Sequence, residues 1–413
     1  IRDQPRSRGL GDVYKRQNLR RLRRIGAVDN GVVRPAFSEA DMTARCWLRD
    51  QFEAAGLMTT LDGIGNVLGV SSNPGPALLL GSHSDTQPTG GWLDGALGVV
   101  YGLEVARTLA EDSATCHLAV DVVSLQDEES RFIGCLGSRS LFGLLATDRE
   151  STAVDRDGIR LVDALREAGL ADVPRTRLEP ERYAGFLEAH IEQGPHLEAD
   201  GMRIGVVTSI VGLGGLRLTF VGQQNHAGPT MMHLRKDAAT ALFALAAEIN
   251  ETFPKIAGPR TVWTMGRAVV RPGAASIVPG YAELDLQYRD PSEEVLDLLE
   301  ADVERLAKEV SSRGGAKVSV ELARERITPV KMDRTLCEYL GVSAERSAPG
   351  QWTEMPSGAY HDAGVISKVL PTAMLFIPSI GGISHDFAED SHDDDIVLGC
   401  QVLADATTSI LSG

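Results

Sequence analysis

The stretch Gly81–Thr86, Gly-Ser-His-Ser-Asp-Thr, contains residues that could bind a metal ion. His83 follows the apolar run Ala77–Leu80, which predicts a buried strand, and Asp94 stands in the glycine-rich loop beyond it. Both side chains would emerge at the carboxyl end of a strand, where open α/β sheets bind ligands. A histidine with a carboxylate is a usual metal ligand set, and Asp85 could hold the imidazole in one tautomer. Alone, the pattern also fits a surface histidine beside an Asp-Gly turn.

Three consecutive acidic residues, Asp127, Glu128 and Glu129, end another expected strand that begins near Leu118. Next to a metal, two adjacent carboxylates would divide into one ligand and one general base. A solvated loop is the alternative interpretation of such a cluster.

Two further histidines, His190 and His385, each follow an apolar, strand-like segment. Either histidine alone could be structural. Strand ends at one sheet edge converge, however, so five candidate ligands at such ends predict a dinuclear metal site: His83, Asp94, Glu129, His190 and His385. Imidazoles combined with a bridging aspartate suit zinc, manganese or cobalt better than calcium or magnesium.

The elements that would position these residues form an α/β framework. Helix and strand alternate over 18–211, which indicates a mainly parallel sheet covered by helices. The order over 212–326 is βαββαβ, typical of a ferredoxin-like two-layer domain. The α/β pattern resumes over 327–413, so the small domain is expected to be inserted into the large one. Residues 1–17 are basic and lack apolar periodicity, and we expect them to be disordered or non-native.

Composition narrows the class of protein. The 413 residues are 43% hydrophobic and 24% charged, as in a globular protein of two domains. A net charge of −16 makes nucleic acid or an anionic membrane an unlikely partner. No apolar run is long enough for a membrane span. The five cysteines are scattered singly, which argues against a disulfide framework and suits the cytoplasm.

With these motifs in place, the chain resembles the metal-dependent amidases of the M20 peptidase clan. The resemblance is to the branch of N-carbamoyl-L-amino acid hydrolases, β-ureidopropionases and allantoate amidohydrolases, and covers nearly all of the sequence from Asn18 onward. It depends on these stretches: GSHSDTQPTGGWLDGALGV, DEESRF, EAHIEQG, NHAGPT, SGAYHDA and PSIGGISHDFAED.

The resemblance implies a role for each matched residue. His83, Asp94 and His190 would bind one metal, and Glu129 and His385 would complete the second, with Asp94 bridging. Glu128 would be the general base. The substrate would contact Gln193, Gly358 and Ser276, with its carboxylate held by Arg289. His226 would reach the active site of the partner subunit in a homodimer and stabilise the oxyanion. His361 and Asp362 would support the ligands.

Alternatives remain for some of these residues. His226 could be a capping or core histidine, Arg289 a surface ion-pair partner, and His361 with Asp362 a ligand pair. Ser130 stands where the family usually has glycine, so the acidic register could shift to Asp127 and Glu128.

Four other positions depart from the pattern of the family. Ser276 replaces an asparagine, Pro229 a threonine, Met231 a proline and Tyr360 a glycine, so the range of substrates is open. Tyr360 could narrow the pocket.

The expected reaction is hydrolysis of the carbamoyl C–N bond of an N-carbamoyl-L-amino acid or related ureide, releasing ammonia and carbon dioxide. Two divalent ions, zinc first and manganese, cobalt or nickel as substitutes, would be required. The alternatives are an allantoate or ureidoglycolate amidohydrolase, a clan-related aminoacylase or peptidase, and a non-catalytic metal-binding protein that keeps the fold.

Overall fold

The computed structural model describes residues 11–323 and 326–413, and the chain divides into two compact units. The large unit comprises the described residues up to Thr208 together with Lys331–Gly413, and the small unit is Ser209–Val330. The sequence placed the small domain at 212–326, within four residues of these bounds.

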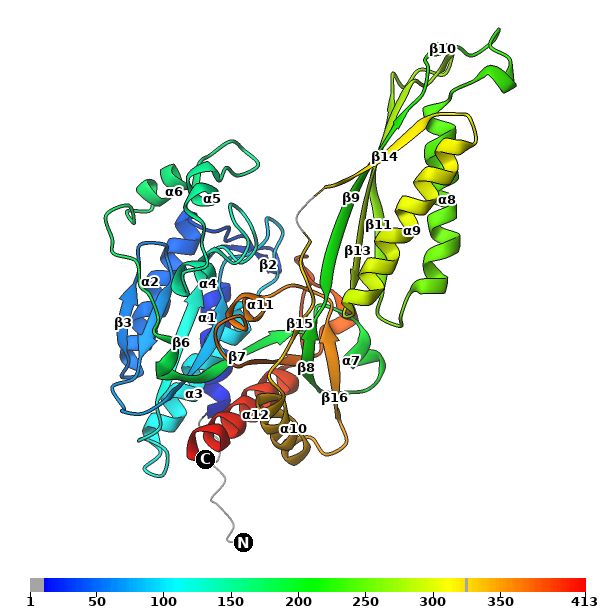
Figure 1. Cartoon of the computed structure of the whole chain (residues 1–413). Coiled ribbons are helices and arrows are strands. Elements are labelled where there is room, and N and C mark those ends of the chain that lie inside the picture. The colour runs from blue at the N-terminus through cyan, green and yellow to red at the C-terminus, as the bar shows by residue number, and fades with distance from the viewer. Residues whose placement is uncertain (1–10, 324–325) are drawn as a thin grey trace. The chain divides into compact units, whose positions relative to one another are not determined.

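A nine-stranded sheet forms the centre of the large unit (Figure 1). Its strands follow the order β15-β8-β17-β7-β5-β6-β4-β3, and β16 pairs with β8. The four neighbours β17, β7, β5 and β6 run parallel, whereas antiparallel pairs extend the sheet on both sides. The expected α/β fold is therefore confirmed, with a parallel centre. The strands are β3 (Met58–Leu61), β4 (Val67–Val70), β5 (Ala77–His83), β6 (Val120–Leu125), β7 (Tyr183–Ile191), β8 (Ile204–Ile210), β15 (Val330–Lys331), β16 (Trp352–Ser357) and β17 (Thr372–Ile377).

Helices cover this sheet, because its central strands carry apolar residues on both faces. Every residue of β5 is buried, as are those of β6 and β17. The helices are α1 (Gly11–Arg23), α2 (Glu39–Ala54), α3 (Ala96–Glu111), α4 (Leu136–Leu141), α5 (Thr147–Thr152), α6 (Leu161–Glu167), α7 (His196–Ala199), α10 (Arg334–Ser347), α11 (Asp362–Ile366) and α12 (Asp393–Ser412). Short elements are β1 (Ala27–Val28), β2 (Gly31–Val32), η1 (Pro180–Arg182) and η3 (Ile380–Gly382).

Helix α1 begins earlier than the sequence indicated. Residues 1–10 lie outside the described residues, but 11–17, also expected to be disordered or non-native, are helical. Leu19 and Leu22 are both 1% exposed and fix this helix to the large unit. The helical backbone extends from that anchor toward the N-terminus, through a segment without apolar periodicity of its own.

The small unit has the predicted βαββαβ order and a four-stranded antiparallel sheet of order β11-β13-β9-β14. In β13 (Tyr281–Asp290), buried residues alternate with half-buried ones, so only one face of the sheet is fully covered. Helices α8 (Ala238–Ile256) and α9 (Glu293–Ser312) pack together on that face, and both begin at capping residues, Asp237 and Ser292. The remaining elements are β9 (Gly212–Val221), β10 (Asn225–His226), η2 (Met232–Leu234), β11 (Val262–Arg271), β12 (Ile277–Val278) and β14 (Lys317–Leu322).

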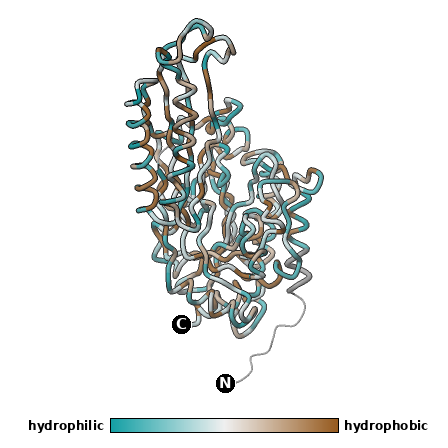
Figure 2. The backbone as a smooth tube through the Cα atoms, turned by 90° about the vertical axis from the view of Figure 1, so that its right-hand side faces the viewer, coloured by the Kyte–Doolittle hydropathy of each residue, from teal (hydrophilic) through white to brown (hydrophobic). Residues whose placement is uncertain are grey.

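Both helices of the small unit are amphipathic. Hydrophobic and hydrophilic positions alternate along their turns (Figure 2). The hydrophobic face packs on the sheet, where Leu245, Phe253, Leu299 and Val303 are all fully buried. Among the described helices of the whole chain, none is both long and apolar enough to cross a membrane.

Candidate metal centre

The candidate ligands gather at the carboxyl ends of the parallel strands. His83 is the last residue of β5 and pairs in register with Leu125, the last residue of β6. His190 lies near the end of β7, opposite Phe376 of β17. Asp94 and Glu129 stand in the loops after β5 and β6, and His385 stands in the loop after β17. All five side chains belong to the large unit, at one edge of one sheet.

Asp94 lies between a pair of histidines on one side and a third histidine on the other. Its Oδ1 is 3.0 Å from His190 Nε2 and 3.6 Å from His83 Nε2, and its Oδ2 is 3.1 Å from His385 Nε2. Two sets of potential ligand atoms result, in each of which the atoms lie within 4.8 Å of one another: His83, Asp94 and His190, and Asp94, Glu129 and His385. Asp94 belongs to both sets.

Hydrogen bonds fix the tautomer of the two buried imidazoles. Nδ1 of His83 donates to the carbonyl of Asp85 at 3.0 Å, and Nδ1 of His190 donates to the carbonyl of Ile191 at 2.8 Å. In the neutral rings the lone pair is therefore on Nε2, which faces Asp94. His190 Nε2 also accepts from the backbone N–H of Gly95 at 3.1 Å. A nitrogen lone pair that points at a carboxylate oxygen is repelled by it unless a positive charge lies between the two atoms. A zinc ion would fit there, because zinc binds nitrogen and oxygen donors.

Glu129 is held at one of its oxygens only. Oε2 accepts from the Gln87 amide at 2.7 Å, while Oε1 is buried, has no hydrogen-bond partner among the described residues and lies 3.7 Å from His385 Nε2. Leaving a buried acceptor unsatisfied is costly unless a ligand completes it. Glu129 Oε1 and His385 Nε2 therefore form a second pair of donors, with Asp94, for a cation.

The same crowding of charge perturbs the carboxyl groups. Burial raises the pKa of Glu129 to about 7, and the negative charge of Asp94 adds to this shift. Burial would also raise the pKa of Asp94, but His190, His385 and His83, when they are protonated, hold it well below its usual range. Burial raises the pKa of Glu128 well above its usual range, with opposition from His83. The Asp94 carboxyl group is thus kept ionised at the centre of the site. The flanking carboxyl groups of Glu128 and Glu129 are stabilised by binding a proton or a cation.

The acidic triplet divides by orientation. Asp127 accepts backbone N–H groups of Arg131, Phe132 and Ile133, at 2.6 to 2.9 Å, so its carboxylate organises the turn. Glu128 Oε2, in contrast, lies 3.8 Å from His83 Nε2. These positions support the register in which Glu128 and Glu129 face the centre.

Ser130, the residue that follows them, has φ of 63°. Glycine adopts this left-handed conformation most readily. This preference gives a physical reason why the family that the chain resembles usually has glycine at this position.

Asp85 orients His83 through its backbone more than through its side chain. Its carboxylate Oδ1 is 3.8 Å from His83 Nδ1, longer than a hydrogen bond, and 3.6 Å from Arg45. Arg45 is fully buried, pairs with Asp41 at 2.9 Å and donates to the carbonyl of Leu125 at the end of β6. No motif in the sequence pointed to Arg45, a charged residue within the amphipathic helix α2.

His361 and Asp362 lie behind the ligands. The ring of His361 packs edge-on against the ring of His190 at 4.6 Å between centroids, and its Nε2 meets the Ser357 hydroxyl at 2.9 Å. Asp362 accepts from the Ser138 hydroxyl at 2.6 Å. Neither residue belongs to the two candidate ligand sets. This arrangement favours the supporting role over the alternative of a ligand pair.

Gln193 lies at the metal-ligand groups themselves. Its amide donates to Asp94 Oδ2 at 3.1 Å and to the Ser384 hydroxyl at 3.2 Å. Gly358 lies in the exposed turn after β16, within the large unit. Tyr360, four residues before Gly364, packs against that glycine, where an added Cβ would meet its ring at 2.8 Å.

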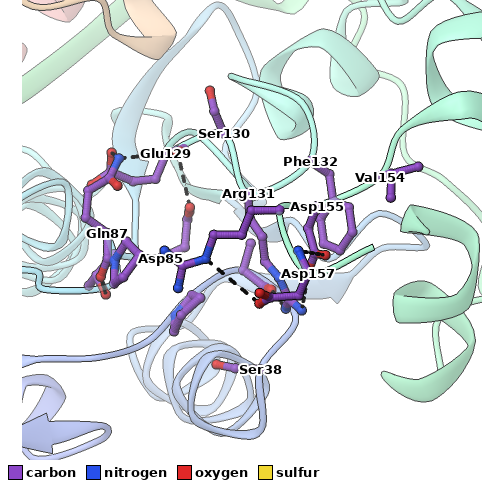
Figure 3. Close-up of a pocket in the computed structure, with 15 residues that line it drawn as sticks. Ser38, Asp85, Gln87, Glu129, Ser130, Arg131, Phe132, Val154, Asp155 and Asp157 are labelled. Carbon is purple, nitrogen blue, oxygen red and sulfur yellow. Dashed lines mark hydrogen bonds and ion pairs between the residues drawn. The ribbon is translucent and has the colours of Figure 1, made fainter. Parts of the chain in front are cut away.

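A cavity of about 530 Å³ adjoins Glu129 within the large unit (Figure 3). Gln87 and Glu129 lie at one end of it and Val154 at the other, with Arg131 between them. The Arg131 guanidinium donates to Asp155 at 3.0 and 3.1 Å, which fixes it along the wall. The volume of this cavity falls in the range of small-molecule binding sites.

Three of the residues that the sequence predicts for the site belong to the small unit: His226, Ser276 and Arg289. Strand β10 pairs with β12 so that His226 lies opposite Ile277, next to Ser276. His226 is exposed, and Asp237 caps helix α8, so the alternatives of a core or capping histidine do not apply. Arg289 is half-buried on β13, and its guanidinium lies 3.5 Å from the amide oxygen of Gln287. Met231 is 63% exposed.

The chain was compared with protein families, curated proteins and solved structures. The model of peptidase family M20/M25/M40 matches residues 79–409. The chain belongs to this family. An N-carbamoyl-L-amino-acid amidohydrolase of Paenarthrobacter aurescens is 34% identical, over 94% of this chain and 95% of that protein. A ureidoglycolate hydrolase of Arabidopsis thaliana is 31% identical over 90% of this chain and 81% of its own length.

Solved structures agree with this assignment. An amidase of the hydantoinase/carbamoylase family from Burkholderia phymatum has a TM-score of 0.93 and 46% identity, covering 100% of this chain and 99% of that one. The M20 family chain is thus an amidohydrolase with two groups of candidate metal ligands.

Proposed function

We propose that this M20 family member hydrolyses the carbamoyl C–N bond of an N-carbamoyl-L-amino acid or a related ureide bearing a carboxylate, using two divalent metal ions. The observation that carries the proposal is the placement of Asp94, with one oxygen toward His83 and His190 and the other toward His385. Zinc suits the nitrogen and oxygen donors best, and manganese, cobalt or nickel could replace it.

The ligand residues would be His83, Asp94 and His190 for one ion, and Asp94, Glu129 and His385 for the other. When bound, the metal pair supplies an acidified water and polarises the ureido carbonyl, a poor electrophile. His361 and Asp85 support the rings of His190 and His83 from behind.

Glu128 is proposed as the general base. It accepts a proton from the attacking water, whose oxygen bonds to the carbamoyl carbon, and it returns that proton to the leaving nitrogen as the C–N bond breaks. Its burial and raised pKa favour a carboxylate that can take up and hold this proton. The first cleavage leaves a carbamate on the other nitrogen, and this carbamate takes up a proton and loses carbon dioxide as its own C–N bond breaks. The products are the amine, carbon dioxide and ammonia.

The family resemblance suggests the substrate contacts. Gln193 and Gly358 are proposed to contact the substrate, and Arg289 is proposed to bind its carboxylate as a bidentate guanidinium. Ser276, beside His226, would contribute a hydroxyl. The cavity next to Glu129 would take part of the substrate, because it opens onto a proposed ligand.

His226 is proposed to act in a homodimer, stabilising the oxyanion in the active site of the partner subunit. Mixing the Glu128→Gln and His226→Ala variants tests this directly. A mixed dimer would contain one site with both functional groups, so activity should reappear in the mixture and not in either variant alone. His233→Ala, which removes another exposed histidine of the same segment, serves as the control. A fully active His226→Ala variant would refute the role.

The experiment that tests the function is a substrate panel. Ammonia release is assayed with N-carbamoyl-L-amino acids, N-carbamoyl-β-alanine, allantoate and ureidoglycolate, each with zinc, manganese, cobalt or nickel added. N-acyl amino acids and dipeptides complete the panel, and release of the free amino acid is their readout. Turnover of N-carbamoyl-L-amino acids supports the proposal. Turnover of ureidoglycolate or allantoate alone would favour the alternative that the Arabidopsis relative suggests. Hydrolysis of N-acyl amino acids or dipeptides without ammonia release would favour an aminoacylase or peptidase.

The cytoplasm is the proposed location. All five cysteines lie among the described residues, none of them is in a disulfide, and thiols persist in a reducing compartment.

A further inference from the structure

Glu389 joins two loops that carry proposed metal ligands. Its Oε1 accepts the backbone N–H groups of Leu93 and Asp94 at 3.1 and 3.0 Å, and its Oε2 accepts the Ser384 hydroxyl at 2.8 Å. Ser384 directly precedes His385. The carboxylate therefore links segments almost 300 residues apart in the sequence, and its side chain is only 2% exposed.

The loop before Asp94 leaves space for this carboxylate at Gly91. A Cβ atom at Gly91 would lie 1.9 Å from the carboxylate carbon of Glu389, far inside van der Waals contact. Its φ does not lie in the left-handed region, so the glycine is required by the proximity of Glu389 and not by the backbone conformation. Gly91 and Glu389 thus fit together as a pair.

The same carboxylate closes a ring of hydrogen bonds around the bridging aspartate. From Glu389 the ring passes to Ser384, then to the Gln193 amide at 3.2 Å, and from that amide to Asp94 Oδ2 at 3.1 Å. The backbone N–H of Asp94 completes it at Glu389. Asp94 is consequently held at its backbone and at its side chain by one connected network.

We propose that Glu389 is a positioning residue that sets the placement of Asp94 relative to His385, and hence the geometry in which both metal ions are bound. It touches no proposed metal or substrate position and acts through the two loops it joins. Partners of this kind change metal affinity about 10- to 100-fold when they are removed. The inference rests on the proposed metal centre.

Zinc binding to the purified full chain tests the role without any substrate. Bound zinc is counted after dialysis against graded free zinc for the wild type, Glu389→Ala and Glu389→Gln. We expect the alanine variant to bind zinc about 10- to 100-fold more weakly. The glutamine variant should be affected less, because its amide oxygen still accepts from Leu93 and Asp94. Wild-type titrations for both variants would overturn the proposal.

Asp121→Asn is the matched control for Glu389→Gln. Asp121 is also a fully buried carboxylate that joins separate segments, accepting from Ser71 N and from the Tyr183 hydroxyl, but it lies at the start of β6, away from the ligands. It should lower the melting temperature and leave zinc binding unchanged. Equal losses of zinc affinity in the two variants would show general destabilisation and contradict a positioning role.

Gly91→Ala provides a second test if Glu389→Ala folds poorly. In the wild-type background the new methyl group should displace the Glu389 carboxylate and weaken zinc binding about as much as its removal does. In the Glu389→Asp background, whose carboxylate is one methylene group shorter and withdraws from residue 91, its further effect should be smaller. Equal effects in both backgrounds would contradict the proposal. A wild-type chain that binds no zinc would refute the metal centre itself, a different outcome from unchanged variants.

Discussion

Gln87 and Glu129 are joined by a hydrogen bond of 2.7 Å from the glutamine amide to the carboxylate Oε2. The amide also lies 3.3 Å from the backbone carbonyl of Glu129. These two contacts leave Oε1 of Glu129 directed to the group that contains His385 and Asp94. Gln87 thereby determines which carboxylate oxygen is presented to a metal.

The Gln87→Met variant should weaken binding of the second metal ion. Methionine keeps the length of the side chain but cannot donate to Glu129, so Oε2 competes with Oε1 for the cation. We expect about tenfold lower affinity for one of two bound ions, measured by metal titration. Gln401→Met, which removes an amide bonded to Asp405 on helix α12, should leave both affinities unchanged. Equal titrations for the wild type and Gln87→Met would contradict this function.

The Glu128→Gln variant should retain metal and lose turnover. The amide has nearly the same shape as the carboxylate but cannot accept a proton, so kcat should fall by about two orders of magnitude or more. Metal content and melting temperature serve as checks that the centre is intact. The exposed Glu53→Gln variant on helix α2 should behave as the wild type. Near-normal kcat would remove Glu128 from the role of base.

The Gly95→Ala variant should damage the metal centre through His83. Gly95 has φ of 62°, and a Cβ there would lie 2.4 Å from His83 Nε2. Gly169→Ala is the control, because Gly169 has φ of 74° and, among the described residues, no atom within 4 Å of such a Cβ. Gly169→Ala should lose roughly 1–2 kcal/mol from backbone strain, measured by denaturant unfolding. Gly95→Ala should lose more, because its ψ of −47° lies outside the left-handed region that other residues adopt. Only Gly95→Ala should lose metal affinity, and equal metal binding in both would contradict the contact.

Removal of metal should destabilise the chain. A ligand at 100 times its dissociation constant stabilises the folded state by about 2.7 kcal/mol for each site. Dialysis against a chelator should therefore lower the melting temperature by several degrees and abolish hydrolysis, and added zinc should restore both. The chelator-treated protein should also regain stability with cobalt or manganese. A melting temperature and an activity that do not respond to the chelator would exclude a metal centre of this kind.

The strand-end argument predicted the candidate ligands because each follows an apolar run. His83 and His190 lie at or near the ends of β5 and β7, Glu129 and His385 follow β6 and β17, and these four strands are neighbours in the parallel part of the sheet. The strands and helices of the small domain could also be predicted from the spacing of apolar residues. This spacing is a property of local sequence, with every second residue buried in β13 and a helical period in α8 and α9.

Support for the ligands could not be predicted in the same way. Glu389 and Gln87 lie within the motif stretches that carry the family resemblance, but their partners lie in other loops. Glu389 accepts from two backbone N–H groups, and Gln87 donates to a carboxylate. Such contacts depend on how loops close after the sheet has formed. Asp127 shows the same limit, because its three bonds to backbone N–H groups distinguish it from Glu128 only in three dimensions. The early start of α1 depended on burial of Leu19 and Leu22 against the large unit.

Anomalous scattering from crystals grown with zinc is the most direct test of the metal centre. Data collected on either side of the zinc absorption edge locate the ions independently of the protein model. The structure predicts two peaks in each chain, one within ligand distance of His83 and His190 and the other near Glu129 and His385, with the Asp94 carboxylate between them. A single peak, or two peaks that do not share Asp94, would contradict the account.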